Sequence, residues 1–115
     1  MKTNEDVLNL VFKISDGIEH EVSEEGIVTI LEKQDHKVQK FFRKLKFKIP
    51  MYKKLELDEY SSTVFLAING ENTVSEIGKA LEIKFGDKVN PLYERLLVFL
   101  NHLEVNLKYI EQMNS

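Results

Sequence analysis

The sequence contains no cysteine and no tryptophan, only two prolines, and no long hydrophobic run. Without cysteine the chain can form no disulfide, thiol nucleophile or cysteine-ligated zinc site. Its longest apolar runs, VFLAI (64–68) and LLVFL (96–100), are far too short to cross a bilayer. The stretch MKTNEDVLNL carries acids where a secretory signal carries basic residues. We therefore expect a cytoplasmic protein that does not enter a membrane.

Sequence patterns of catalytic sites are also missing. The three histidines, His20, His36 and His102, lack the spacing of metal ligands, and no glycine-rich phosphate loop occurs. Ser61 and Ser62 follow a helix-start signal, where we expect their hydroxyls to stabilise the first turn, and no nucleophile elbow surrounds them. The sequence thus predicts a protein that is not an enzyme and holds neither a metal nor a cofactor.

The composition that remains is typical of a globular domain, but its charge is unevenly distributed. The 115 residues are 43% hydrophobic and 30% charged, which predicts one domain, 1–115, with a single core. Nine of the 16 Lys and Arg residues lie in 33–54, against one of the 19 acids. This basic segment is interpreted either as a solvated face or as a landing surface for an acidic partner.

The first half of the chain predicts a small antiparallel sheet. Residues 1–17 form an N-terminal arm or strand, and 18–32 alternate as a β-hairpin that turns at SEEG, where Gly26 allows positive φ. Residues 36–47 have the spacing of a short, basic amphipathic helix inserted in the sheet. In the strand 51–57, Leu55 and Leu57 are expected to point inward, with Lys54 and Glu56 outside.

The second half predicts three helices within 58–106, followed by a short strand or tail at 107–111. The expected boundary signals are an N-cap at Asp58, a stop at Asn69-Gly70, a capping box from Thr73 to Glu76, a stop at Gly86, and a start at Asn90-Pro91 for a helix that runs to about Val105. Gly78 allows a close approach to the second helix. The predicted fold is α+β and winged-helix-like: a small antiparallel β-sheet (18–57) followed by a three-helix bundle that stacks on one face of the sheet.

Two features of this layout favour the binding of an extended peptide. The strand 51–57 is expected at a sheet edge, where unpaired amides and carbonyls can accept an added strand, and its lysines suit an acidic peptide. In the third helix a first apolar stripe suffices for the core (Leu92, Leu96, Phe99, Leu103), while a second (Tyr93, Leu97, Leu100) forms either more core or an exposed wall.

Two other functions remain as alternatives. A winged-helix body suggests nucleic-acid binding, but the third helix offers only Arg95 and His102 as donors, beside Glu94 and Glu104, so nucleic acid is not the expected partner. A self-associating structural protein is the other alternative, in which two copies form a homodimer through the edge strand.

The ordered set of motifs in residues 18–111 resembles the PqqD family, named after coenzyme PQQ synthesis protein D. The resemblance is carried by the run KLELDEYSSTVFLAINGENTVSEIGKALEIKFGDKVNPLYERLLVFLNHLEVNLKYIE and by the upstream EEGIVTILEK. Two positions depart from the family pattern. Val64-Phe65 stands where a tryptophan is common, and Asn106 replaces a glycine near the end of the third helix.

The resemblance implies a peptide-binding domain that recognises a precursor peptide. Members of the family capture the leader of a ribosomally made peptide by strand addition and present it to a modifying enzyme, often a radical-SAM enzyme. Carried over by position, the resemblance implies that the leader pairs with one set of residues (Tyr52, Lys53, Lys54, Leu55, Glu56) and lies against another on the third helix (Tyr93, Leu97, Leu100, Glu104).

Overall fold

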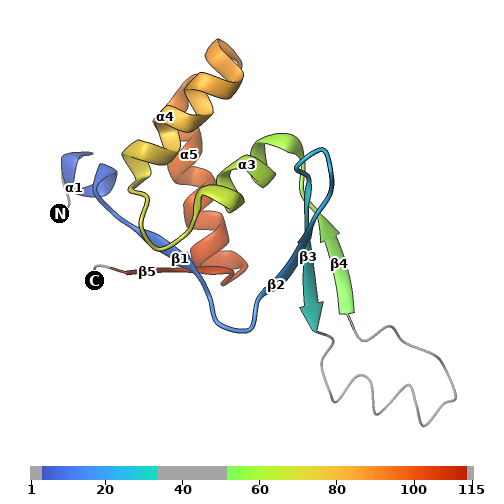
Figure 1. Ribbon diagram of the computed structural model, residues 1–115. Coiled ribbons are helices and arrows are strands. Elements are labelled where there is room, and N and C mark those ends of the chain that lie inside the picture. The colour runs from blue at the N-terminus through green and yellow to red at the C-terminus, as the bar shows by residue number, and fades with distance from the viewer. Residues whose placement is uncertain (1–3, 34–51, 114–115) are drawn as a thin grey trace, which may run out of the picture.

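The computed structural model describes residues 4–33 and 52–113, which form a helical body with a small sheet at one side (Figure 1). The elements follow in the order α1 (Asn4–Leu8), β1 (Phe12–Ile14), β2 (Glu19–Val22), β3 (Val28–Lys33), β4 (Tyr52–Glu56), α3 (Glu59–Ala67), α4 (Val74–Phe85), the 3-10 turn η1 (Gly86–Val89), α5 (Leu92–Asn101), the π-helical turn η2 (His102–Asn106) and β5 (Ile110–Gln112). The α+β class is confirmed, and the winged-helix-like arrangement stays a prediction. The basic helix expected at 36–47 lies outside the described residues.

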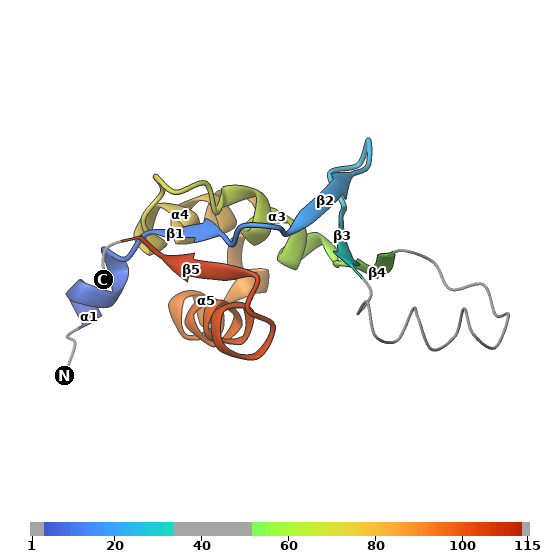
Figure 2. The ribbon, with the colours of Figure 1, turned by 90° about the horizontal axis from the view of Figure 1, so that it is seen from below.

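The predicted β-hairpin and the strand that follows it form one antiparallel sheet with the order β2-β3-β4. Gly26 has φ +82° in the hairpin turn, as its position predicts. The expected N-terminal arm contains both a helix, α1, and a strand, β1, and the expected C-terminal strand is β5. These two strands pair antiparallel with Ile14 opposite Ile110, so the ends of the described chain close over the helical body (Figure 2).

Local capping chemistry determines most helix boundaries. The carboxylate of Asp58 accepts the amide of Ser61 at 2.7 Å, and Thr73 and Glu76 form the predicted capping box at the start of α4. Each cap satisfies a first-turn amide that has no partner inside the helix. Pro91 was expected to be the first residue of the third helix, but it is the N-cap of α5, which begins at Leu92.

The stop at Asn69-Gly70 acts differently from the prediction. Helix α3 already ends at Ala67, and Gly70, with φ +80°, donates its amide to the carbonyl of Phe12 at 2.9 Å. The positive φ therefore serves a tertiary contact between the α3–α4 turn and β1. It does not form the left-handed cap of the helix that we expected.

The helices do not all stack on one face of the sheet, which corrects the expected layering. Helix α3 contacts β3, while α4 packs on α3 and α5 packs on α4. The core combines residues from all three helices with Val28 and Ile30 of β3 and with Phe12 and Ile110 of the terminal strands. Among the described helices, α3 has the most contacts with the β2-β3-β4 sheet. Its buried Phe65 also meets the ring of His20 in β2 edge-to-face, with the ring centres 5.0 Å apart.

Candidate functional site

Strand β4 is an edge strand in the described part of the chain. Its residues 52–56 pair with β3 from Thr29 opposite Glu56 to Lys33 opposite Tyr52, and β3 pairs on its other side with β2. No strand within 4–33 or 52–113 pairs with the outer side of β4. The predicted edge strand is therefore confirmed for the residues that the structure describes.

The ladder register determines which backbone groups of β4 face outward. The Leu57 amide donates to the Val28 carbonyl at 2.8 Å, so these two residues form a hydrogen-bonded pair. Hydrogen-bonded pairs alternate along an antiparallel ladder. The amides of Lys53 and Leu55 therefore face β3, whereas those of Lys54 and Glu56 face the open edge.

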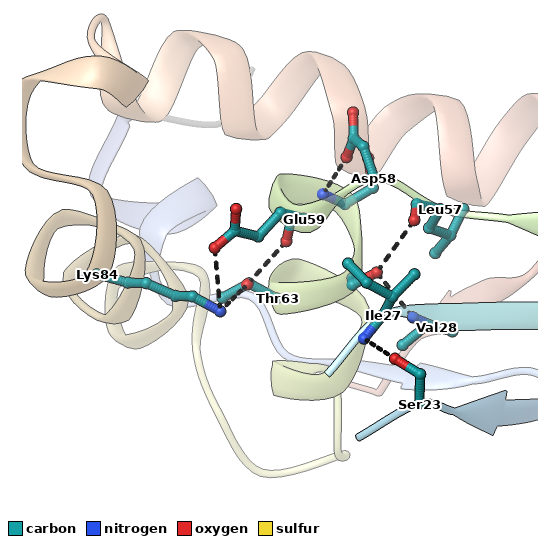
Figure 3. Close-up of polar contacts among 10 residues, drawn as sticks. Ser23, Ile27, Val28, Leu57, Asp58, Glu59, Thr63 and Lys84 are labelled. Atoms are coloured by element: carbon teal, nitrogen blue, oxygen red, sulfur yellow. Dashed lines mark hydrogen bonds and ion pairs between the residues drawn. The ribbon is translucent and has the colours of Figure 1, made fainter. Parts of the chain in front are cut away.

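A buried serine, Ser62 of α3, contacts the backbone of Val28 and Leu57, two residues labelled in Figure 3. The hydroxyl of Ser62 accepts the amide of Val28 at 2.8 Å and makes a longer contact of 3.5 Å to the carbonyl of Leu57. It thus replaces the backbone bond that would complete the ladder at this pair. The expectation that the Ser61 and Ser62 hydroxyls stabilise the helix start is wrong for Ser62, since Asp58 caps the helix and Ser62 positions the strand.

The side chains of β4 follow the predicted alternation, with one difference in burial. Leu55 lies opposite the buried Ile30 and therefore on the inner face of the sheet, but it remains 37% exposed. Leu57 is half-buried, as expected of an inward residue. Lys53, Lys54 and Glu56 are exposed. An apolar side chain and two lysines are thus accessible along the open edge.

The four residues predicted as a wall on the third helix do not face this edge. Tyr93 packs its ring on Gly78 and donates its hydroxyl to the Ser75 carbonyl at 3.3 Å. Leu100 is buried, and Leu97 and Glu104 line hollows together with residues of α1 and β1 or the segment between them. The interpretation of these residues as one site with β4 is therefore corrected, because packing on α4, α1 and β1 turns them away.

The opposite side of α5 forms a groove with the start of α3. A hollow of about 570 Å³ is lined by Tyr60, Pro91, Glu94, Arg95, Val98, Phe99 and His102. At about 100° per residue, the centre of this face lies roughly 180° from the residues at 93, 97, 100 and 104. We call this hollow the α3–α5 groove. Its most exposed apolar residue is Val98, which is 72% accessible.

Tyr60 forms the floor of the α3–α5 groove and is held by three neighbours. The Tyr60 ring lies 5.9 Å from the Phe99 ring and 6.2 Å from the Phe85 ring, and the Arg95 guanidinium lies 5.2 Å from the Tyr60 ring centre. Arg95 is anchored in turn by donating to the Lys88 carbonyl at 2.9 Å. A cation over an aromatic face is electrostatically favourable, so the Arg95 charge is fixed at the groove.

The polar atoms of the groove are suited to bind further groups. The Tyr60 hydroxyl is buried and has no hydrogen-bond partner among the described residues. Burial raises the pKa of Tyr60, Arg95 opposes this rise, and the Asp58 charge adds to it, so the hydroxyl stays protonated. His102, on the rim, lies with Nδ1 2.9 Å from Nδ2 of Asn106. The groove thus combines an apolar lining with a guanidinium and an imidazole, while the Tyr60 hydroxyl is buried.

The groove and the open edge of β4 are close in the chain. Tyr60 follows the last residue of β4 by four positions. In Figure 2, β2 and β4 form opposite edges of the sheet, and β4 lies on the side where α5 is seen. The sequence did not predict this face of α5, because Phe99 belongs to the apolar stripe assigned to the core, while Val98 lies about 100° outside both apolar stripes.

No group of three or more His, Asp or Glu side chains that could hold a metal ion occurs in residues 4–33 and 52–113. In the same ranges, no helix combines the length and the apolar composition that a membrane span requires. No protein-family model matches the chain, and no curated protein or solved structure matches it either.

Proposed function

We propose that this protein is a non-catalytic adaptor that captures the leader of a ribosomally made precursor peptide and presents it to a modifying enzyme, such as a radical-SAM enzyme. The observation that carries the proposal is the open edge of β4, which is followed four residues later in the chain by Tyr60 of the apolar α3–α5 groove. An edge strand supplies sequence-independent backbone bonds, and an adjoining groove supplies side-chain selection. The resemblance to the PqqD family supports the same function.

The leader adds as a fourth strand beside β4. Its carbonyls accept the outward amides of Lys54 and Glu56, and the strand continues past Asp58 toward α5. One of its apolar side chains enters the α3–α5 groove against Tyr60 and Val98. Acidic side chains on the leader meet Lys53, Lys54 and Arg95, which lie beside the acids Glu56 and Glu94 on the same surface.

The adaptor needs no catalytic group, because it acts through position. A leader held on the protein keeps the attached core peptide at a high effective concentration near an enzyme that binds the same adaptor. Cleaving the leader from the core removes this effect without changing the chemistry of the core. The modifying enzyme then acts on the core only at the rate of an unassisted encounter.

Backbone amide shifts during titration with the leader of any short precursor peptide whose gene adjoins this one would test the proposal. We expect the largest changes at Lys54 and Glu56 and at the groove residues Tyr60, Val98 and His102. Changes confined to the hairpin turn at 23–26, or no binding by leaders encoded beside a neighbouring modifying enzyme, would contradict it.

Self-association is a second candidate function, and the charges at the two sheet edges favour it. Strand β2 carries the exposed acids Glu19 and Glu21, while β4 carries Lys53 and Lys54. Opposite charges across a strand pair are favourable, so β2 of one copy can pair with β4 of another. Sedimentation over a range of protein concentrations distinguishes this function, since a chain that stays monomeric at every concentration excludes it.

A further inference from the structure

The face of α5 opposite the α3–α5 groove carries two hollows of its own. One, of about 270 Å³, is lined by Leu8, Tyr93, Glu94 and Leu97. The other, of about 210 Å³, is lined by Leu10, Phe12, Leu97, Leu100, Asn101, Glu104 and Gln112. Because Leu97 lines both, the two hollows adjoin. We call them together the α1–α5 face.

The floor of the α1–α5 face is apolar and is held in place by backbone bonds. Leu8, Leu10 and Leu97 are all half-buried, so each offers part of its side chain to a ligand. The segment after α1 is fixed because the Leu10 carbonyl accepts the Val74 amide at 2.9 Å. This bond connects the segment that carries Leu10 to the start of α4.

The rim of this face is acidic. Glu94 lies beside the first hollow and Glu104 beside the second, and neither Lys nor Arg is among the described residues that line them. The nearby strand β1 contributes Phe12 to the lining, while the next residue, Lys13, pairs with Glu111 at 3.1 Å. An apolar floor with an acidic rim fits a ligand that carries apolar and basic side chains together.

We propose that the α1–α5 face is a second docking surface, which binds a short amphipathic segment of a partner protein with leucine-like side chains on one side and Lys or Arg beside them. The segment places its apolar side chains over Leu8, Leu10 and Leu97 and its cations at Glu104 and Glu94. This surface and the α3–α5 groove lie on different sides of α5 and share Glu94 at their boundary. The proposal holds whether or not the groove binds a leader, because Leu8, Leu10, Leu97 and Glu104 line only the α1–α5 face.

An amphipathic peptide of 14 residues composed only of leucine and lysine serves as the probe, titrated into the full-length ¹⁵N-labelled chain. We expect amide shifts at Leu8, Leu10, Leu97 and Glu104. The variant Glu104→Lys should weaken binding about fivefold, since reversing one rim charge removes an attraction and adds a repulsion. The matched control is Glu24→Lys, which makes the same charge change on the exposed hairpin turn and should leave the affinity unchanged. Glu94 stays unchanged because it also lines the α3–α5 groove.

Three results would overturn the proposal. Equal weakening by Glu104→Lys and Glu24→Lys would show that the peptide responds only to net charge. Shifts centred on Tyr60 and Val98 would place the peptide in the groove. Self-association of the free chain that Glu104→Lys abolishes would show that a second copy occupies the face. If Glu104→Lys alters the thermal melt, Glu104→Gln replaces it, with Glu24→Gln as its control.

Discussion

Replacing Lys54 with proline tests whether the open edge of β4 pairs with a peptide. The Lys54 amide faces outward, so proline removes a donor that the protein's own ladder does not use, and an edge strand tolerates proline at such a position. The residue before proline is restricted to extended backbone, which Lys53 already has in β4. The fold should therefore survive the substitution.

The expected effect on leader binding follows from the lost backbone contact. One main-chain hydrogen bond contributes about 0.5–1.5 kcal/mol, and the ring also prevents close approach at the neighbouring bond. A total loss of about 1–3 kcal/mol raises Kd roughly fivefold to 150-fold. Isothermal titration calorimetry with the leader measures this change, and Lys54→Ala separates the lost charge from the lost amide.

The comparison with Leu55→Pro distinguishes the two edges of the strand. The sequence alone suggests that Leu55→Pro abolishes peptide pairing, but the register directs the Leu55 amide toward β3. Proline at 55 should therefore disrupt the protein's own sheet and lower its thermal stability, whereas Lys54→Pro should not. If Lys54→Pro binds the leader as tightly as Lys54→Ala, the strand-addition mechanism is refuted. If Leu55→Pro melts like the parent, the register is wrong.

Three further predictions concern the packing that supports the site. Ser62→Ala should lower the free energy of unfolding in urea by about 1–3 kcal/mol, because the buried Val28 amide loses its acceptor, while Ser61→Ala should change it little. Gly78→Ala should also lower the free energy of unfolding in the same assay, because the new methyl would lie 2.7 Å from Tyr93 Cζ. Overpacking costs about 1–3 kcal/mol, which exceeds the gain of roughly 1 kcal/mol in helix propensity. A Gly78→Ala variant as stable as the parent would contradict this packing. Burial, followed by the hydrogen bond to Glu32 and the Glu32 charge, raises the pKa of Tyr109 above its usual 10.0. The protonated Tyr109 hydroxyl therefore stabilises the fold fully below about pH 10, and this contribution is lost as the pH rises further. The melting temperature of Tyr109→Phe should accordingly fall less steeply above about pH 10 than that of the parent.

Much of the local structure could be predicted from short stretches of sequence. The Asp58 cap, the Thr73–Glu76 capping box and the turn at Gly26 all depend on bonds or dihedral angles within a few residues, and the structure confirms each of them. The close approach at Gly78 is confirmed too, although only the structure shows that the Tyr93 ring fills the space.

The composition of the candidate site could be predicted only in part. The edge strand could be predicted from its alternating pattern and its lysines. In a sheet of only three strands, the two outer strands each have a neighbour on one side only. The groove beside it is not visible, because Tyr60 and Phe99 lie in different helices and meet only through packing. The role of Ser62 also depends on a partner 34 residues away in sequence, Val28.

The sequence by itself determined where α3 and α4 begin and where the β2–β3 hairpin turns, since capping and turn signals act through neighbouring residues. Tertiary structure decided how α5 is rotated about its axis. Its apolar arc is so wide that several rotations bury a comparable area, and no local signal selects among them. Contacts with α4, α1 and β1 select the one in which Tyr93 and Leu100 turn inward and Val98 is left at the groove.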